Sequence, residues 1–153
     1  MSRWAPRAAS RQLALQVLYA MDLLARTRAE ASADPLPAAD EVFERISRNF
    51  ELPEGARGFA KELVTGVVAG QDALDTRIGR CARNWRVDRM AAVDRNVLRL
   101  AAYELVATDT PASVVIDQAI ELARRFGGDP SPAFVNGVLD AVARNDVHQG
   151  VEL

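Results

Sequence analysis

The chain has 153 residues, of which 49% are hydrophobic and 26% charged, and this is the composition of a globular domain rather than of a disordered or low-complexity chain. A formal net charge of −2 does not describe a globally basic binder, and the single cysteine, Cys81, excludes an internal disulfide bond. No apolar run approaches the roughly 18 residues of a membrane span, and residues 1–12 lack the apolar core of a signal peptide, so we expect a cytoplasmic protein.

The spacing of apolar residues predicts helices along the chain and no convincing strand. The expected helices, in chain order, span residues 6–27, 38–50, 56–84, 94–107 and 113–126, and a last helix begins at residue 131. Glycine inside a helix costs about 1 kcal/mol relative to alanine, so the glycines of the third helix indicate close helix contacts or a break near Gly70. We therefore predict a single all-α domain of about six helices over residues 1–153.

The first predicted helix carries different residue types on its different sides. Its apolar stripe begins at Leu13, while Leu15 and Tyr19 are expected to project from the opposite face. Arg7 and Arg11 lie on the flank, one helical turn apart.

Glycine and proline mark the turn before the last predicted helix. The stretch Phe126-Gly127-Gly128 is a C-terminal glycine signal for the fifth helix. Ser131 is the expected N-cap of the last helix, with Pro132 at its first position.

Positive charge is concentrated in two blocks of the sequence. Residues 1–28 hold five arginines against one acid, a balance of +4, and residues 77–99 hold seven arginines against two acids, a balance of +5. Two local positive blocks on an acidic remainder favour an anionic partner that binds locally. The alternative is that the two blocks belong to a solvated surface with many salt bridges, and the charge pattern considered alone favours this alternative.

Residues suited to catalysis or metal binding are scarce. The only histidine, His148, lies in the polar C-terminal tail, which argues against a histidine base or a multi-histidine metal site. No phosphate-binding loop of the G-x-x-x-x-G-K-[ST] type is present, and Cys81 fits a small residue on the packed side of its helix. We therefore predict no catalytic residue, no metal and no cofactor.

Two acidic residues fall on or beside the apolar stripe of the helix predicted over residues 94–107. Asp94 fits either a helix N-cap or a contact with a partner. Glu104 is expected to be held by a neighbouring arginine, because a lone buried carboxylate would be too costly.

Residues 85–140 carry the motifs of a known family. Trp85 and Arg89 are followed by VDRNVLRLAAYEL at residues 93–105, IDQAIELA at residues 116–123, Phe126-Gly127, and FVNGVLD at residues 134–140. The arginine-headed stretch RQLALQVLY at residues 11–19 precedes them. This combination, in this order, resembles the NusB family of transcription antitermination factors over nearly the whole chain, and least over residues 28–56.

The resemblance implies an all-helical RNA-binding protein built from two three-helix bundles, without a cofactor. Members bind the single-stranded boxA element of ribosomal RNA leader transcripts. They usually do so with the small-subunit ribosomal protein that doubles as NusE, within an RNA polymerase antitermination complex. RNA, NusE and that complex are thus the partners that the resemblance implies.

By position, the resemblance assigns RNA contacts to Arg7 and Arg11 on the first helix, with Arg3 joining from the arm. Arginines at i and i+4 present two guanidinium groups about one turn apart, and the helix N-terminus adds positive potential. Ala8 and Ala9 stand where further arginines are common in the family.

Five further residues are candidates by position. Phe134 matches a family aromatic that can lie against a base, with ordinary core packing as the alternative. Arg95 and Arg99 are expected to project away from the apolar stripe of their helix, where they would extend the RNA track or be plain surface arginines. An exposed Tyr19, together with Asp94, resembles the family's surface for the ribosomal-protein partner.

Two other functions stay open at this point. The same fold serves as an N-terminal RNA-binding domain of ribosomal RNA cytosine methyltransferases, but a catalytic domain would then have to follow, and this chain stops at Leu153. A protein–protein helical module, working as a homodimer that hides the RNA face, is the other alternative.

Overall fold

The computed structural model describes the main chain of residues 5–31 and 35–149, and the side chains of residues 7–28 and 35–145. Within these ranges the chain forms seven α-helices, one short 3-10 helix and no strand, which confirms the predicted all-α class. The chain divides into two compact units, residues 1–68 and residues 69–153. A single domain over residues 1–153 stays a prediction.

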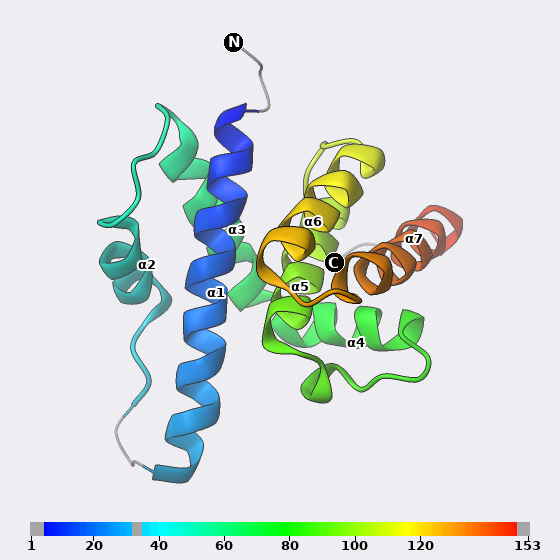
Figure 1. Cartoon of the computed structure of the whole chain (residues 1–153), viewed down its shortest axis with the longest axis horizontal. Coiled ribbons are helices and arrows are strands. Elements are labelled where there is room, and N and C mark those ends of the chain that lie inside the picture. The colour runs from blue at the N-terminus through cyan, green and yellow to red at the C-terminus, as the bar shows by residue number, and fades with distance from the viewer. Residues whose placement is uncertain (1–4, 32–34, 150–153) are drawn as a thin grey trace. The chain divides into compact units, whose positions relative to one another are not determined.

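The first unit is built from the first three helices, drawn in blue to green in Figure 1: α1 (Ala5–Ala31), α2 (Ala39–Ser47) and α3 (Ala56–Ala69). Helix α1 packs against α2. The buried hydroxyl of Ser10 donates a hydrogen bond of 2.6 Å to the carbonyl of Ala56, which ties α1 to the start of α3. Arg57 then ties α3 to α2, because its guanidinium donates to both carboxylate oxygens of Glu44, at 2.6 and 2.7 Å.

Helix α1 is buried around more of its circumference than the sequence predicts. Leu13 is fully buried, as expected. Leu15, expected on the opposite face, is buried too, and so is Leu18, while Tyr19 is half-buried rather than exposed. The prediction of an outward-facing side at Leu15 and Tyr19 was therefore wrong, because apolar residues of this helix are enclosed on more than one side.

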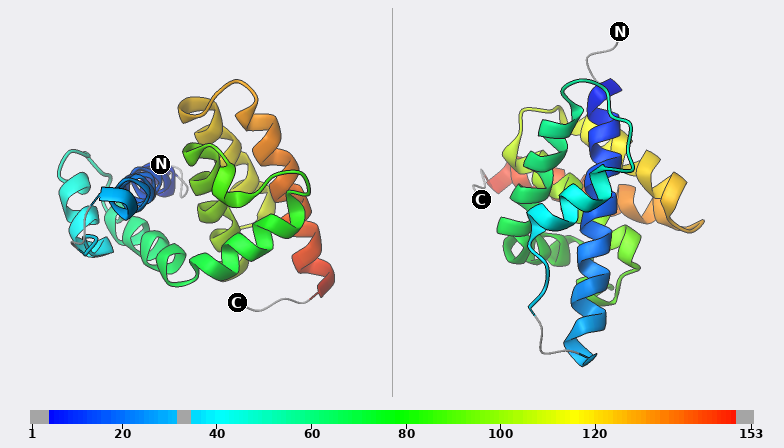
Figure 2. Two further views of the ribbon diagram at one scale, coloured as in Figure 1. Left: turned by 90° about the horizontal axis from the view of Figure 1, so that it is seen from below. Right: turned by 90° about the vertical axis from the view of Figure 1, so that its left-hand side faces the viewer.

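The second unit contains the remaining helices: α4 (Gln71–Cys81), the 3-10 helix η1 (Val87–Arg89), α5 (Ala92–Ala107), α6 (Ala112–Phe126) and α7 (Ser131–Gln149). Helices α5, α6 and α7 pack against one another, and α4 packs against α5 and α7 (Figures 1 and 2). Their facing apolar residues form the core of this unit, which includes Leu74, Ile78, Val97, Leu98, Val115, Leu122, Val135, Leu139 and Val142.

The predicted third helix is in fact two helices. The chain leaves the helical path at Gly70, between α3 and α4, which is one of the two outcomes that the embedded glycines indicated. The second bundle consequently has four α-helices, so the expected pair of three-helix bundles was wrong in its second half. Helix α4 ends at Cys81, and residues 82–86 form a loop that leads into η1.

Gly127 is required by a close approach rather than by a left-handed backbone. Helix α6 ends at Phe126, as predicted, but Gly127 has a φ of −96°, which any residue can adopt. A Cβ atom at this position would lie 2.6 Å from Oγ of Ser131 and 2.8 Å from the carbonyl oxygen of Ala123. The Ser131 hydroxyl also accepts a hydrogen bond of 3.2 Å from the backbone N–H of Gly128, which holds the turn between α6 and α7.

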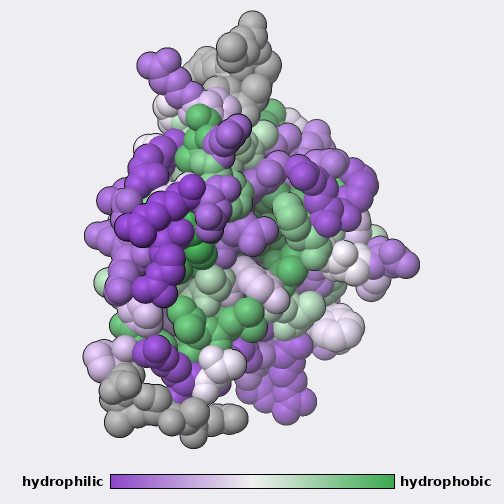
Figure 3. Space-filling view, turned by 60° about the vertical axis from the view of Figure 1, so that its left-hand side comes forward, coloured by the Kyte–Doolittle hydropathy of each residue, from purple (hydrophilic) through white to green (hydrophobic). Residues whose placement is uncertain are grey.

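Apolar side chains reach the surface between charged residues on the face shown in Figure 3. Over the described ranges, the large hydrophobic residues with exposed side chains are Leu23, Leu36, Val68 and Trp85. Scattered residues of this kind are normal in folded proteins. Trp85 is set apart from the others by its size and by its 59% exposure. No helix in the described part of the chain is long and apolar enough to cross a membrane.

Candidate nucleic-acid interface

The head of α1 holds two arginines against one aromatic ring. The guanidinium carbon of Arg7 lies 4.5 Å from the centroid of the Phe59 ring on α3, and that of Arg11 lies 5.8 Å from the same centroid. Both distances are within the range of a cation–π interaction. The predicted one-turn spacing of the two arginines thus places both guanidinium groups at one ring.

The two arginines of this cluster differ in exposure. Arg7 is half-buried, whereas Arg11 is only 2% exposed, so its predicted place on the flank of the helix was wrong. Burial of Arg11 follows from its position one turn further into the helix, beside the buried Ser10. Arg7 is therefore the member of the pair that can meet a ligand, and Arg3 lies outside the described residues.

Arg95 does not project to the surface. It is 2% exposed, and its guanidinium donates to the carbonyl of Met90 at 2.6 Å and to that of Val87 at 3.4 Å. The predicted outward projection was wrong, because the loop before α5 folds back and supplies backbone acceptors for this side chain. Arg95 thereby fixes the path of the chain from η1 into α5.

Arg99 is also buried, and its predicted projection was wrong for a different reason. Its guanidinium donates to both carboxylate oxygens of Asp75 on α4, at 2.7 and 2.9 Å, and to the side-chain oxygen of Asn96 at 3.3 Å. This bidentate ion pair joins α4 to α5 inside the second unit. Arg95 and Arg99 thus make stabilising contacts inside the second unit, whereas we expected them to contact RNA at the surface.

The two acids singled out from the sequence have different surroundings. Helix α5 begins at Ala92, so Asp94 lies in the first turn of the helix and is not its N-cap. The Oδ1 atom of Asp94 is buried and has no hydrogen-bond partner among the described residues. Glu104 is almost completely buried, as expected for a carboxylate on the apolar side of α5.

Trp85 and Phe134 form an aromatic pair in the second unit. Their ring centroids lie 5.8 Å apart at an interplanar angle of 71°, which is an edge-to-face contact. Phe134 is half-buried and lies in the first turn of α7, two residues after the expected helical proline. Both rings line a mostly apolar hollow of about 260 Å³, together with Met90, Ala91, Asp94 and Pro130.

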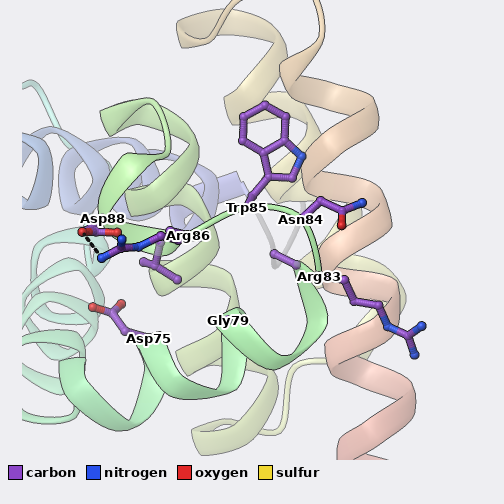
Figure 4. A pocket seen from close by; sticks show the side chains of 9 residues that line it. Asp75, Gly79, Arg83, Asn84, Trp85, Arg86 and Asp88 are labelled. Carbon is purple, nitrogen blue, oxygen red and sulfur yellow. Dashed lines mark hydrogen bonds and ion pairs between the residues drawn. The ribbon is translucent and has the colours of Figure 1, made fainter.

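Trp85 also lines a second hollow. It is wide and open, about 640 Å³ in volume, and residues of α4, of the loop that follows it and of η1 line it. Figure 4 shows Arg83 and Arg86 pointing to different sides of this loop, with Trp85 between them in the chain. Arg86 makes an exposed ion pair of 3.1 Å with Asp88. The loop therefore combines an exposed indole with the positive charge of Arg83, whereas the charge of Arg86 is balanced by Asp88.

The described residues contain no group of three or more histidine, cysteine, aspartate or glutamate side chains arranged to hold a metal ion. The free Cys81 is half-buried and lies 3.2 Å from the side-chain nitrogen of Asn145, which donates to its sulfur. This environment is that of a packed thiol at the contact of α4 with α7.

Comparison with known proteins identifies the family. A model of the NusB family matches residues 8–144. This chain belongs to the NusB family. The transcription antitermination protein NusB of Anaeromyxobacter sp. (strain Fw109-5) is 48% identical over 137 residues, covering 90% of this chain and 89% of that protein. The protein of the same name from Myxococcus xanthus (strain DK1622) is 44% identical over 138 residues, covering 90% and 94%.

Solved structures of NusB proteins have the same fold. T. maritima NusB is 32% identical and superimposes with a TM-score of 0.77, covering 92% of each chain. A chain in a crystal structure of the antitermination factors NusB and NusE in complex with dsRNA is 28% identical, with a TM-score of 0.77, and covers 95% of this chain and 99% of that one. The predicted NusB-like fold is thus confirmed.

In this NusB-family chain, Trp85 was not predicted from the sequence as a functional residue, and it was named there only as part of the family motif. A signal was present, because Trp85 falls on no apolar stripe and stands in a segment with Arg80, Arg83, Arg86 and Arg89. An aromatic residue interleaved with arginines is typical of single-stranded nucleic-acid binding.

Proposed function

We propose that this NusB-family protein binds single-stranded boxA-type RNA of ribosomal RNA leader transcripts together with the small-subunit ribosomal protein NusE. It acts in the cytoplasm, within an RNA polymerase antitermination complex, and it makes and breaks no covalent bond. Family membership supports this proposal, as does the name transcription antitermination protein NusB carried by its relatives.

The observation that carries the proposal is the Arg7 guanidinium above the Phe59 ring. A ring face orients a guanidinium without neutralising its charge, and a guanidinium can bind a phosphate through its N–H groups. Arg7 lies in the first turn of α1, where the helix dipole adds positive potential. The Arg11 guanidinium lies 5.8 Å from the centroid of the same ring, and Arg3 is proposed to add charge from the arm.

Phe134 stays a candidate for base stacking, because its ring is half-buried and lines an apolar hollow. Arg95 and Arg99 are not part of the proposed RNA surface, since their guanidinium groups are buried against internal acceptors. The proposed RNA surface of this protein therefore contains fewer arginines than the sequence suggested.

For NusE we propose a contact at Tyr19 and at Asp94. The buried, unsatisfied Oδ1 atom supports a partner role for Asp94, because an unpaired carboxylate oxygen is costly until a donor reaches it. Tyr19 is half-buried on α1 and can offer both ring area and a hydroxyl group.

The test is a titration of fluorescently labelled RNA with the full chain, with and without NusE. The RNA is a boxA-type single strand, and the control is the same sequence annealed to its complement. We expect NusE to raise the affinity for the single strand by about tenfold, a typical coupling between two ligands of one protein. Equal affinity for single strand and duplex would contradict the single-strand proposal, and no effect of NusE would contradict joint binding.

A further inference from the structure

Trp85 lines two hollows of different chemistry. The hollow of about 260 Å³ is mostly apolar, and we call it the Trp85 hollow. The second, open hollow is lined by Arg83 and Arg86 together with two acids, Asp75 and Asp88, of which Asp75 pairs with Arg99 and Asp88 pairs with Arg86. Trp85 therefore borders both a site suited to a flat apolar group and a polar site to which Arg83 brings positive charge.

The walls of the Trp85 hollow are held in place by internal contacts. The Phe134 ring contacts the indole edge to face, with the two centroids 5.8 Å apart. Met90 is buried, and its carbonyl accepts the 2.6 Å hydrogen bond from Arg95, so this wall is tied to α5. The hollow is thus a preformed feature of the second unit, and the 59% exposure of Trp85 leaves its ring open to a ligand.

The charges around Trp85 favour one placement of a nucleotide. Asp94 lines the Trp85 hollow, and its carboxylate would repel a phosphate placed there. Arg83 lines the second hollow, where its guanidinium can attract a phosphate. Arg86 is held by its 3.1 Å ion pair with Asp88 and points to a different side of the loop (Figure 4).

We propose that the Trp85 hollow takes one unpaired base of an RNA strand, stacked on the indole of Trp85 beside Phe134, with a flanking phosphate bound by Arg83. This proposal rests on the proposed RNA-binding function and adds to it a contact surface in the second unit, formed by the loop after α4. Base stacking on aromatic side chains is tolerant of sequence, so this contact strengthens binding without selecting one base.

The direct test uses the intrinsic fluorescence of Trp85. The chain has two tryptophans, Trp4 and Trp85, so a full-length Trp4→Phe protein reports on Trp85 alone. Titration with a labelled boxA-type single strand gives RNA binding from the label's anisotropy and stacking from the quenching of the indole. We expect quenching to follow the binding curve, as it must if a base lies on the ring.

Variants separate stacking from charge. Trp85→Ala is expected to weaken RNA binding by about tenfold, whereas Trp85→Phe, which keeps a stacking ring, restores most of the affinity. Arg83→Ala is expected to lower the slope of log K against log salt by about 0.7, the contribution of one phosphate on a single strand. Arg124→Ala removes an exposed arginine of α6 that lines neither hollow and is the matched control, with an unchanged slope.

Each failure has a distinct meaning. RNA that binds by anisotropy without changing Trp85 fluorescence overturns the proposed stacking and leaves the RNA-binding function standing. RNA that does not bind at all, with or without NusE, overturns the proposed function itself. A Trp85→Ala protein that loses NusE but keeps RNA shows that the hollow is a protein-docking site, which also overturns the proposal.

Discussion

The buried ion pair between α4 and α5 allows a quantitative test of the structural role assigned to Arg99. Arg99→Met keeps the apolar stem and removes the guanidinium, so that Asp75 loses hydrogen bonds of 2.7 and 2.9 Å. The Arg99 side chain is 7% exposed and that of Asp75 is 27% exposed, so water can replace part of the lost interaction on the Asp75 side only.

The size of the effect follows from these contacts. Breaking a fully buried pair costs about 3–5 kcal/mol, and the exposure of Asp75 lowers the expected loss to about 3 kcal/mol, near the value of one or two charge-assisted hydrogen bonds. For a chain of this length, that loss lowers Tm by roughly 6–12 °C.

The assay is urea and thermal unfolding of four proteins: wild type, Arg99→Met, Asp75→Asn and the double variant. We expect the double variant to be about 2 kcal/mol more stable than the sum of the single losses predicts. Losses that add within about 0.5 kcal/mol would refute the ion pair. An Arg99→Met protein that stays folded but has a smaller salt slope for RNA binding would restore the RNA role that the structure argues against.

Three further predictions concern the α6–α7 turn and the first unit. Gly127→Ala should lower the free energy of unfolding by about 1–3 kcal/mol, because the added Cβ meets Ser131 at 2.6 Å; urea unfolding at wild-type stability would show that the turn can shift freely. Ser10→Ala should cost about 1 kcal/mol in the same assay, through loss of the buried 2.6 Å hydrogen bond to α3, and a neutral effect would contradict that link. Phe59→Leu should weaken RNA binding about two- to fivefold by removing the ring beneath Arg7, with an unchanged salt slope in the titration because no charge is lost; a changed slope would count against a positioning role.

The periodicity of apolar residues predicted the fold class and some of the helix ends. The predicted ends at residues 107 and 126 match α5 and α6, and the glycine at position 70 marked the break that divides the third predicted helix. These features depend on neighbours along one helix or turn, which is the information that spacing in a sequence contains.

The environments of the arginines were not predictable in the same way. A helical wheel places Arg99 away from the apolar stripe of its own helix, but its partner Asp75 lies 24 residues earlier, on a helix that packs against that side. Arg95 likewise finds backbone carbonyls of the preceding loop. Whether a polar residue is buried depends on contacts with other helices and loops. The periodicity of a single helix carries no information about those contacts.

In the candidate site, too, local features were predictable from the sequence and contacts with other helices were not. The i, i+4 spacing correctly predicted that Arg7 and Arg11 share one side of α1, whereas the aromatic ring beneath them comes from α3 and was not foreseen. Trp85 lies in a loop, where helical periodicity predicts nothing. The arginines around it in the sequence were a signal, and its 59% exposure and its contact with Phe134 make it a candidate.

The central claim is that positive charge at the head of α1 contacts the phosphates of an RNA strand. It is tested most directly by the salt dependence of binding for wild type and Arg7→Ala, measured on a boxA-type single strand with NusE present. The exposed Arg45→Ala on α2 is the matched control. We predict that Arg7→Ala lowers the slope of log K against log salt by about 0.7 and that Arg45→Ala leaves it unchanged. Equal slopes for wild type and Arg7→Ala would contradict the claim.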